Sequence, residues 1–157
     1  MTERDTSRVF AVCRVDPPSA TAQHKGVVVQ GGRPRFYTKK RVREATALWK
    51  AIIHSGKSPG FRTLEGAVAV SVRFTYAFPA GFSKRKRAAG AIPKPTRPDL
   101  DNLSKVILDA ATAAAVWHDD GQVASLKLDK VWGDHGEVSI LIEPAAAGTD
   151  TNTTPKG

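Results

Sequence analysis

The chain has a single cysteine and no long apolar run. Because Cys13 has no second cysteine to pair with, a disulfide within the chain is excluded, and so is a zinc site of several thiolates. No segment approaches the roughly 18 consecutive apolar residues of a transmembrane helix, and the first residues lack a signal peptide's apolar core. We therefore expect a cytoplasmic protein with no membrane partner.

Acidic residues are also scarce relative to basic ones. The 157 residues include 24 lysines and arginines against 15 aspartates and glutamates, which gives a formal net charge of +9 at pH 7. A surplus of this size in a chain of single-domain length favours an acidic partner, most commonly nucleic acid. The alternative is a solvated basic surface with no dedicated partner, because net charge bears on association and not on fold.

The order of predicted elements indicates one α+β domain at residues 8–144, between ends at 1–7 and 145–157 that we expect to be disordered. β-branched and aromatic residues predict four strands and a hairpin, and apolar residues at helical spacing predict two helices. The strands are 8–15, 67–78, 122–132 and 137–144, the hairpin arms flank Gly31 and Gly32, and the helices are 38–55 and 100–115. This order implies a mixed β-sheet with two main helices packed on it.

Residues of special backbone character mark the boundaries of these elements. Pro34 predicts that the second hairpin arm is short or lies at a sheet edge, since proline cannot donate to a β-ladder. Thr38 is the expected N-cap of the first helix. Residues 79–98 show no periodicity, which predicts a structureless loop, and loops of that length are usually functional or disordered.

Two aspartates lie at the start of the second predicted helix. Asp99 and Asp101 are two residues apart, a spacing that in extended backbone points both side chains to one side of the chain. Asp101 also lies near the helix N-terminus, where the helix dipole favours negative charge. Lys105 follows Asp101 by one helical turn, so its ammonium group is expected near whatever Asp101 binds.

More aspartates follow along and beyond that helix. Asp109 continues the polar stripe, and Asp119 and Asp120 lie in a turn that can bring the chain back toward the sheet. Carboxylates held together repel one another by about 1 to 4 kcal/mol per pair at about 4 Å. A divalent cation removes that cost, and oxygen ligands select Mg²⁺ or Mn²⁺. We therefore expect the aspartates on both sides of the helix to converge on one cation.

Such a cluster fits phosphodiester hydrolysis. A metal held by carboxylates polarises the phosphate and lowers the pKa of an attacking water, and Lys105 can neutralise the developing charge. The alternative is structural, with the Asp99–Asp101 segment capping the helix, Lys105 forming a salt bridge and residues 118–121 forming a turn. His118 is open to the same two interpretations, as a general base or metal ligand or as a turn residue.

Basic residues gather just before the first aspartate. The 79–98 loop contains no acid and six cations, namely Lys84, Arg85, Lys86, Arg87, Lys94 and Arg97. Because phosphate contacts position a nucleic acid, we expect these cations to lead a DNA backbone toward Asp99. Phe82 either wedges against unstacked bases or anchors the loop, and we favour anchoring. Residues 39–43 on the first helix offer a second basic patch, which a solvated helix face explains equally well.

The order of these residues matches a known pattern. Asp99-Leu100-Asp101-Asn102 is followed by Lys105, and Asp119-Asp120-Gly121-Gln122-Val123 opens a predicted strand after the helix. This arrangement resembles the RusA family of crossover junction endodeoxyribonucleases, in which D-L-D-N, a lysine and a helix precede D-D-x-Q-[VI]. Residues 97–143 follow the pattern closely, and residues 8–50 follow it more loosely.

The resemblance implies a homodimeric, Mg²⁺-dependent nuclease of bacterial or phage origin that cuts four-way DNA junctions by paired symmetric nicks. It assigns Asp99, Asp101 and Asp120 as metal-binding catalytic carboxylates and Lys105 as the catalytic lysine. A two-fold dimer also suits a junction, because two coordinated cuts require two sites related by one axis.

The chain departs from the family pattern in two places. Pro98 stands immediately before the first aspartate, where some members have a basic residue, although Arg97 lies one step earlier. The loop after the first strand is less basic than usual and leaves Lys25 as its DNA-binding candidate. Both departures bear on substrate preference more than on chemistry.

Two other functions fit parts of the pattern. The first is a non-enzymatic DNA-binding module whose acidic residues are structural. The second is a DxD phosphatase or glycosyltransferase, which the segment IPKPTRP disfavours because such sites normally follow a buried apolar strand. Loss of nicking with retained DNA binding after Asp101→Asn would separate an enzyme from a binding module.

Overall fold

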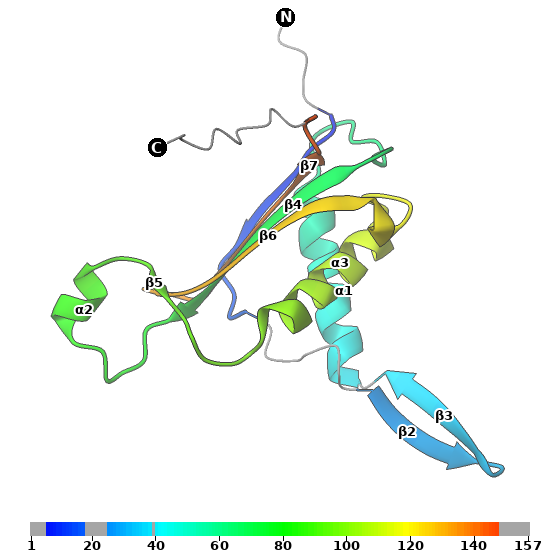
Figure 1. Cartoon of the computed structure of the whole chain (residues 1–157), viewed down its shortest axis with the longest axis horizontal. Coiled ribbons are helices and arrows are strands. Elements are labelled where there is room, and N and C mark those ends of the chain that lie inside the picture. Colours follow the sequence, from blue (N-terminus) through cyan, green and yellow to red (C-terminus); the bar gives the residue numbers. More distant parts are fainter. Residues whose placement is uncertain (1–5, 18–24, 39, 148–157) are drawn as a thin grey trace, which may run out of the picture.

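A five-stranded mixed sheet forms the centre of the computed structural model, which describes residues 6–17, 25–38 and 40–147 (Figure 1). Its strands are β1 (Val9–Cys13), β4 (Val68–Ala77), β5 (Ile92–Pro93), β6 (Val123–Gly133) and β7 (Glu137–Pro144). The spatial order is β1-β7-β4-β6-β5, with β4 parallel to β6 and antiparallel to β7. The predicted strands β6 and β7 are therefore not neighbours, because β4 lies between them. Most of the two tails predicted to be disordered lies outside the described residues.

Side-chain alternation separates the two faces of this sheet. The buried positions on β4 are Val68, Val70, Val72 and Phe74. The same face includes alternate residues of β1 and β7, namely Val9, Ala11, Val138, Ile140 and Ile142. Phe10 and Val12 of β1 point the other way and are 55% and 52% exposed. The sheet therefore buries one face and leaves the other open.

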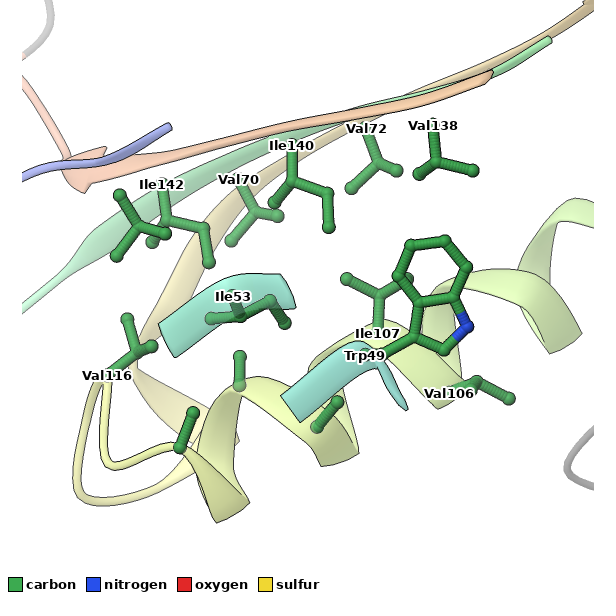
Figure 2. Packing of buried hydrophobic residues seen from close by; sticks show 14 of the residues in the cluster. Trp49, Ile53, Val70, Val72, Val106, Ile107, Val116, Val138, Ile140 and Ile142 are labelled. Atoms are coloured by element: carbon green, nitrogen blue, oxygen red, sulfur yellow. The ribbon is translucent and has the colours of Figure 1, made fainter. Parts of the chain in front are cut away.

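Two helices cover the buried face, as expected for this α+β class. They are α1 (Lys40–Ser55) and α3 (Leu100–Ala113). Figure 2 shows Trp49 of α1 and Ile107 of α3 directed toward Val72 of the sheet, among other buried side chains. Full burial of one such side chain stabilises the fold by about 1.5 to 3 kcal/mol. Among the described residues, no helix combines the length and apolar character required to cross a bilayer.

A hairpin projects from the start of α1, away from the sheet (Figure 1). Its arms are β2 (Lys25–Gln30) and β3 (Arg33–Thr38). Gly31 and Gly32 have φ angles of 60° and 71°, the left-handed values that a two-residue hairpin turn requires. Pro34 does not shorten the second arm, because in a two-stranded sheet every strand is an edge. Thr38 is the last residue of β3 and α1 begins at Lys40, and the Thr38 N-cap stays a prediction, because residue 39 and the Thr38 side chain lie outside the described part of the chain.

The segment predicted to be structureless, residues 79–98, contains two short elements. Helix α2 spans Lys84–Ala88, and β5 pairs with the end of β6. Periodicity could not reveal either element, because the five residues of α2 make less than two helical turns and the two residues of β5 make a single alternation. The Asp119–Asp120 turn is likewise more regular than predicted, because the 3₁₀ helix η1 spans Asp120–Gln122.

A close backbone approach ties the end of α1 to β1, and it predicts an intolerance at Gly56. Phe10 N–H donates to the Gly56 carbonyl at 2.9 Å, and a Cβ added at Gly56 would lie 2.7 Å from the Phe10 oxygen. We expect Gly56→Ala to lower the free energy of unfolding by about 1 to 3 kcal/mol, because the crowded atoms are backbone. Urea unfolding followed by circular dichroism measures this. Gly81→Ala is the control, since no atom lies within 4 Å of a Cβ there, and equal effects of the two substitutions would contradict the prediction.

Candidate active site

Asp99 and Asp101 open helix α3 with free carboxylates. Asp99 occupies the N-cap position with extended backbone (φ −76°, ψ 139°), yet its side chain makes no cap hydrogen bond. Asp101 is exposed in the first turn, and Lys105 is exposed one turn further along. Within the described residues, neither Asp101 nor Lys105 has a hydrogen-bond or ion-pair partner for its side chain. The structural alternative of a side-chain cap and a helix salt bridge therefore does not hold.

The amphipathic pattern of α3 sets the direction of this polar stripe. Its buried residues are Leu103, Ser104, Val106, Ile107, Ala110 and Ala111. Packing these residues on the sheet and α1 turns the opposite side of the helix to solvent. Asp101, Lys105 and Asp109 occupy that side and are exposed.

The turn after α3 uses one of its two aspartates for structure and leaves the other free. Asp119 caps η1, and its Oδ1 accepts from the Gly121 N–H at 2.7 Å. The Gln122 side chain closes the capping box by accepting from the His118 and Asp119 amides at 2.8 and 3.1 Å. Asp120 is exposed, and its carboxylate has no partner among the described residues. A capping role therefore distinguishes Asp119 from Asp120.

His118 belongs to this turn and not to the aspartates at the start of α3. Its Nε2 lies 2.9 Å from Glu65 Oε1, and both side chains are largely exposed. Of its two sequence interpretations, the structure therefore favours the turn residue. An exposed pair of this kind contributes little to stability.

Helix α3 separates the predicted metal ligands of one chain. Because α3 has 14 residues and rises about 1.5 Å per residue, Asp99 and Asp101 lie about 20 Å from the far end, where Asp120 follows. Ligand oxygens must lie about 2 Å from a shared Mg²⁺. Across the described residues, no three aspartate, glutamate, histidine or cysteine side chains are grouped to hold a metal ion. The expectation that the turn at 118–121 returns Asp120 to Asp99 within one chain is wrong.

One predicted DNA-binding residue is buried. The Lys94 side chain is only 7% exposed, and its Nζ is surrounded by acceptors from Thr96 and Arg97. It cannot reach a phosphate without leaving this site. Arg97 itself is exposed and remains available to DNA. Lys25 begins β2, and its side chain lies outside what the structure describes.

The basic arm, residues 78–91, extends from the end of the sheet next to β5 (Figure 1). Phe82 packs against Phe78 and Trp132, with ring centroids 5.8 and 5.9 Å apart. Since Phe82 is half-buried in this aromatic cluster, it anchors the arm, as we favoured from the sequence. Aromatic pairs at these distances contribute about 0.5 to 1.5 kcal/mol beyond their buried area.

The arm divides its four exposed cations into two kinds. They are Lys84, Arg85, Lys86 and Arg87. Arg87 donates from Nε and Nη2 to the carbonyls of Phe82 and Pro79 at 3.1 and 3.2 Å, and Lys86 Nζ lies 3.9 Å from the Phe82 ring centroid. Among the described residues, the side chains of Lys84 and Arg85 have no such partner. These two are the cations of the arm most available to an external anion.

Fold and site together define a class of small α+β domains in which free aspartates stand at both ends of one helix, beside a basic arm. The chain belongs to the RusA endodeoxyribonuclease family: the family model described as Endodeoxyribonuclease RusA matches residues 17–143. That match includes the whole sheet except β1 and the end of β7, both helices and all the aspartates discussed above.

Two relatives show how far the similarity extends. The chain is 29% identical over 89 residues to YqaN, an uncharacterized protein of Bacillus subtilis (strain 168), a match that covers 54% of this chain and 62% of that protein. It is 29% identical over 128 residues to a crossover junction endodeoxyribonuclease rusA of Lactococcus phage r1t, covering 82% of this chain and 92% of the phage protein. The match thus spans less than two thirds of the Bacillus protein and nearly all of the phage protein.

The different roles of the two turn aspartates predict different stability effects. We expect Asp119→Ala to lower the free energy of unfolding by about 1 kcal/mol, because the η1 capping box is lost. Asp120→Ala should change it by less than about 0.5 kcal/mol, because its exposed carboxylate has no partner to lose. Chemical denaturation of both variants measures the difference, and a larger loss for Asp120→Ala would contradict the assignment.

Proposed function

We propose that the chain is a Mg²⁺-dependent endodeoxyribonuclease that resolves four-way DNA junctions by paired symmetric phosphodiester hydrolysis. The proposal rests above all on the unpaired carboxylates of Asp99, Asp101 and Asp120 in a chain of the RusA family. Exposed aspartates without partners are costly to hold near one another and are the hard oxygen ligands that Mg²⁺ or Mn²⁺ prefers. A purely structural role for them would require hydrogen bonds or ion pairs, which the described residues do not supply.

A dimer would bring together ligands that α3 keeps apart within one chain. A two-fold axis across the middle of α3 sets the helices of two chains antiparallel, so the start of one helix lies near the end of the other. Asp99 and Asp101 of one chain would then hold an ion together with the Asp120 carboxylate of the second copy. Two such sites form per dimer, about one helix length apart. Paired cuts at symmetric positions of a junction require two sites of this kind.

The residues of the chain have distinct tasks in such a site. The three aspartates would hold a divalent cation, which would supply Lewis acidity toward the scissile phosphate and acidify an attacking water. Lys105 extends from α3 one turn beyond Asp101, where its ammonium group offsets negative charge that develops on the phosphate. Arg97, two residues before Asp99, contacts the neighbouring backbone phosphate.

The basic arm binds DNA outside the site of cleavage. Lys84 and Arg85 contact phosphates, while Lys86 and Arg87 chiefly hold the arm together through Phe82. Phosphate contacts position the junction without reading its sequence. Selectivity for four-way junctions then comes from the spacing of two sites and two arms in the dimer.

A mixing experiment tests the shared site directly. Asp101→Asn and Asp120→Asn each remove a ligand, so we expect either variant alone to bind a synthetic four-way junction in EDTA and to nick it undetectably in Mg²⁺. When the two are unfolded and refolded together, random pairing makes half of the dimers mixed, and each mixed dimer has one intact site. Nicking should therefore return to about a quarter of the wild-type rate per chain.

The mixing experiment also separates the alternatives. Nicking can recover only if the ligands of one site come from two chains. A mixture of well-folded, dimeric variants that does not nick the junction would therefore contradict the shared site. Wild-type protein that binds junctions but never cuts them in Mg²⁺ or Mn²⁺ would instead support the non-enzymatic DNA-binding module. Linear duplex of the same sequence is the substrate control.

Salt dependence tests the proposed phosphate contacts of the arm. Each neutralised phosphate contributes about −0.9 to the slope of log affinity against log salt concentration for duplex DNA. We expect Lys84→Gln with Arg85→Gln to weaken junction binding and to reduce the magnitude of this slope by about 3.6, because two contacts are lost from each chain of the dimer. Lys94→Met should leave the slope unchanged, because Lys94 is buried. An unchanged slope in the double variant would exclude both residues as phosphate contacts.

A further inference from the structure

Two lysine ammonium groups hold the backbone immediately before Asp99. Lys130 Nζ donates to the carbonyls of Thr96 and Pro98, both at 2.6 Å. Lys94 Nζ donates to the carbonyl and hydroxyl oxygens of Thr96 at 3.1 and 2.6 Å, and to the carbonyl of Arg97. We call these two side chains the lysine clasp. Three consecutive carbonyls, those of residues 96–98, are thereby satisfied by ammonium groups.

Proline explains why this segment needs side-chain donors. Pro93, Pro95 and Pro98 have no amide hydrogen, so the strand that begins at β5 cannot continue as a regular ladder. The last main-chain contact is the Lys94 N–H donating to the Lys130 carbonyl at 2.9 Å. Beyond that point the clasp replaces the sheet as the support of the backbone. The segment therefore stays attached to β6 as far as the residue before Asp99.

The clasp is costly to bury. Lys94 is 7% exposed, and its Nζ lies 4.6 Å from the Trp132 ring centroid and 5.0 Å from that of Tyr76. Burial lowers the pKa of Lys94, and the nearby positive charge of Lys130 lowers it further. A methionine of similar length would pack against the same rings without a desolvation cost. Burial of Lys94 close to Lys130 costs free energy. We therefore infer that the hydrogen bonds from Lys94 to residues 96 and 97 are needed.

The exposed side chains of the proposed site lie next to the carbonyls that the clasp holds. Arg97 and Asp99 alternate with Pro98 in this segment, and the side chains of both are exposed, while carbonyls on either side of them are held. Fixing the carbonyls fixes the backbone dihedrals just before Asp99, and these determine where its carboxylate points. A ligand residue that is not itself held by hydrogen bonds depends on such support.

We propose that Lys94 and Lys130 are positioning residues, which orient the 96–98 backbone so that Asp99 faces the same side as Asp101. The inference rests on the proposed function of those aspartates. Lys130 and Lys94 do not touch the substrate, and they act only through the backbone that they hold.

Lys130→Met tests the clasp, with Lys127→Met as its matched control. Lys127 lies on the same strand but on the opposite, open face of the sheet, paired in register with Ser71, so both substitutions remove one charge from β6. We expect Lys130→Met to slow single-turnover junction cleavage by about 10- to 100-fold and to raise the Mg²⁺ concentration for half-maximal rate. Junction affinity in EDTA should stay within about twofold of wild type, and Lys127→Met should change neither quantity.

The outcomes distinguish positioning from other roles. Cleavage by Lys130→Met as fast as by Lys127→Met would overturn the proposal. So would a loss of junction affinity as large as the loss of rate, because that would identify Lys130 as a DNA contact. Should Lys130→Met fold poorly, Lys94→Met provides the same comparison, since a methionine can pack between Trp132 and Tyr76.

A second measurement does not depend on nuclease activity. The carbonyl ¹³C resonances of Thr96 and Pro98 correlate with the amides of Arg97 and Asp99 in a standard triple-resonance spectrum. We expect both carbonyl resonances to shift upfield in Lys130→Met and to stay in place in Lys127→Met. Unchanged resonances would overturn the clasp even if the enzyme cuts DNA. Shifted resonances would support the clasp even if no cleavage were found and the proposed function failed.

Discussion

Leu103, Val106 and Ile107 of α3 are buried against the sheet and α1, and this contact sets the geometry of the rest of the site. A helix packed along one side is a rigid spacer of about 1.5 Å per residue. It presents Asp101 and Lys105 to solvent together, and it also holds them a helix length away from Asp120. One packing contact therefore both assembles half of the proposed metal site and prevents a single chain from completing it.

The lysines and arginines of the chain have unlike tasks although their charges are the same. Lys84 and Arg85 stand exposed on the basic arm, whereas Lys94 is buried beneath the segment that leads to Asp99. Arg87 and Lys86 lie between these extremes, exposed but engaged with Phe82 or its carbonyl. The formal net charge of +9 therefore overstates how much positive charge is available to bind DNA. Some of the cations are already bound to carbonyls or aromatic rings of the protein itself.

Much of the fold was predictable from local pattern. Strict alternation predicted strand 67–78 against the observed Val68–Ala77, and helical spacing predicted helix 100–115 against Leu100–Ala113. Short elements such as α2 and β5 were not predictable, because they contain too few residues to show a period. Among the site residues, helical spacing predicted the exposed stripe of α3. Lys94 was wrongly predicted to bind DNA, because a buried lysine and a surface lysine look the same in the sequence.

By itself, the sequence determined the α+β class, the helix that bears Asp101 and Lys105, and the likeness to RusA endonucleases, because each depends on residues near one another along the chain. Only the tertiary structure decided that Asp119 caps a turn while Asp120 stays free, and that Asp120 lies far from Asp99. It alone paired Lys130 with the carbonyls before Asp99. Those relations join residues distant in sequence, and packing, unlike local spacing, determines which of them meet.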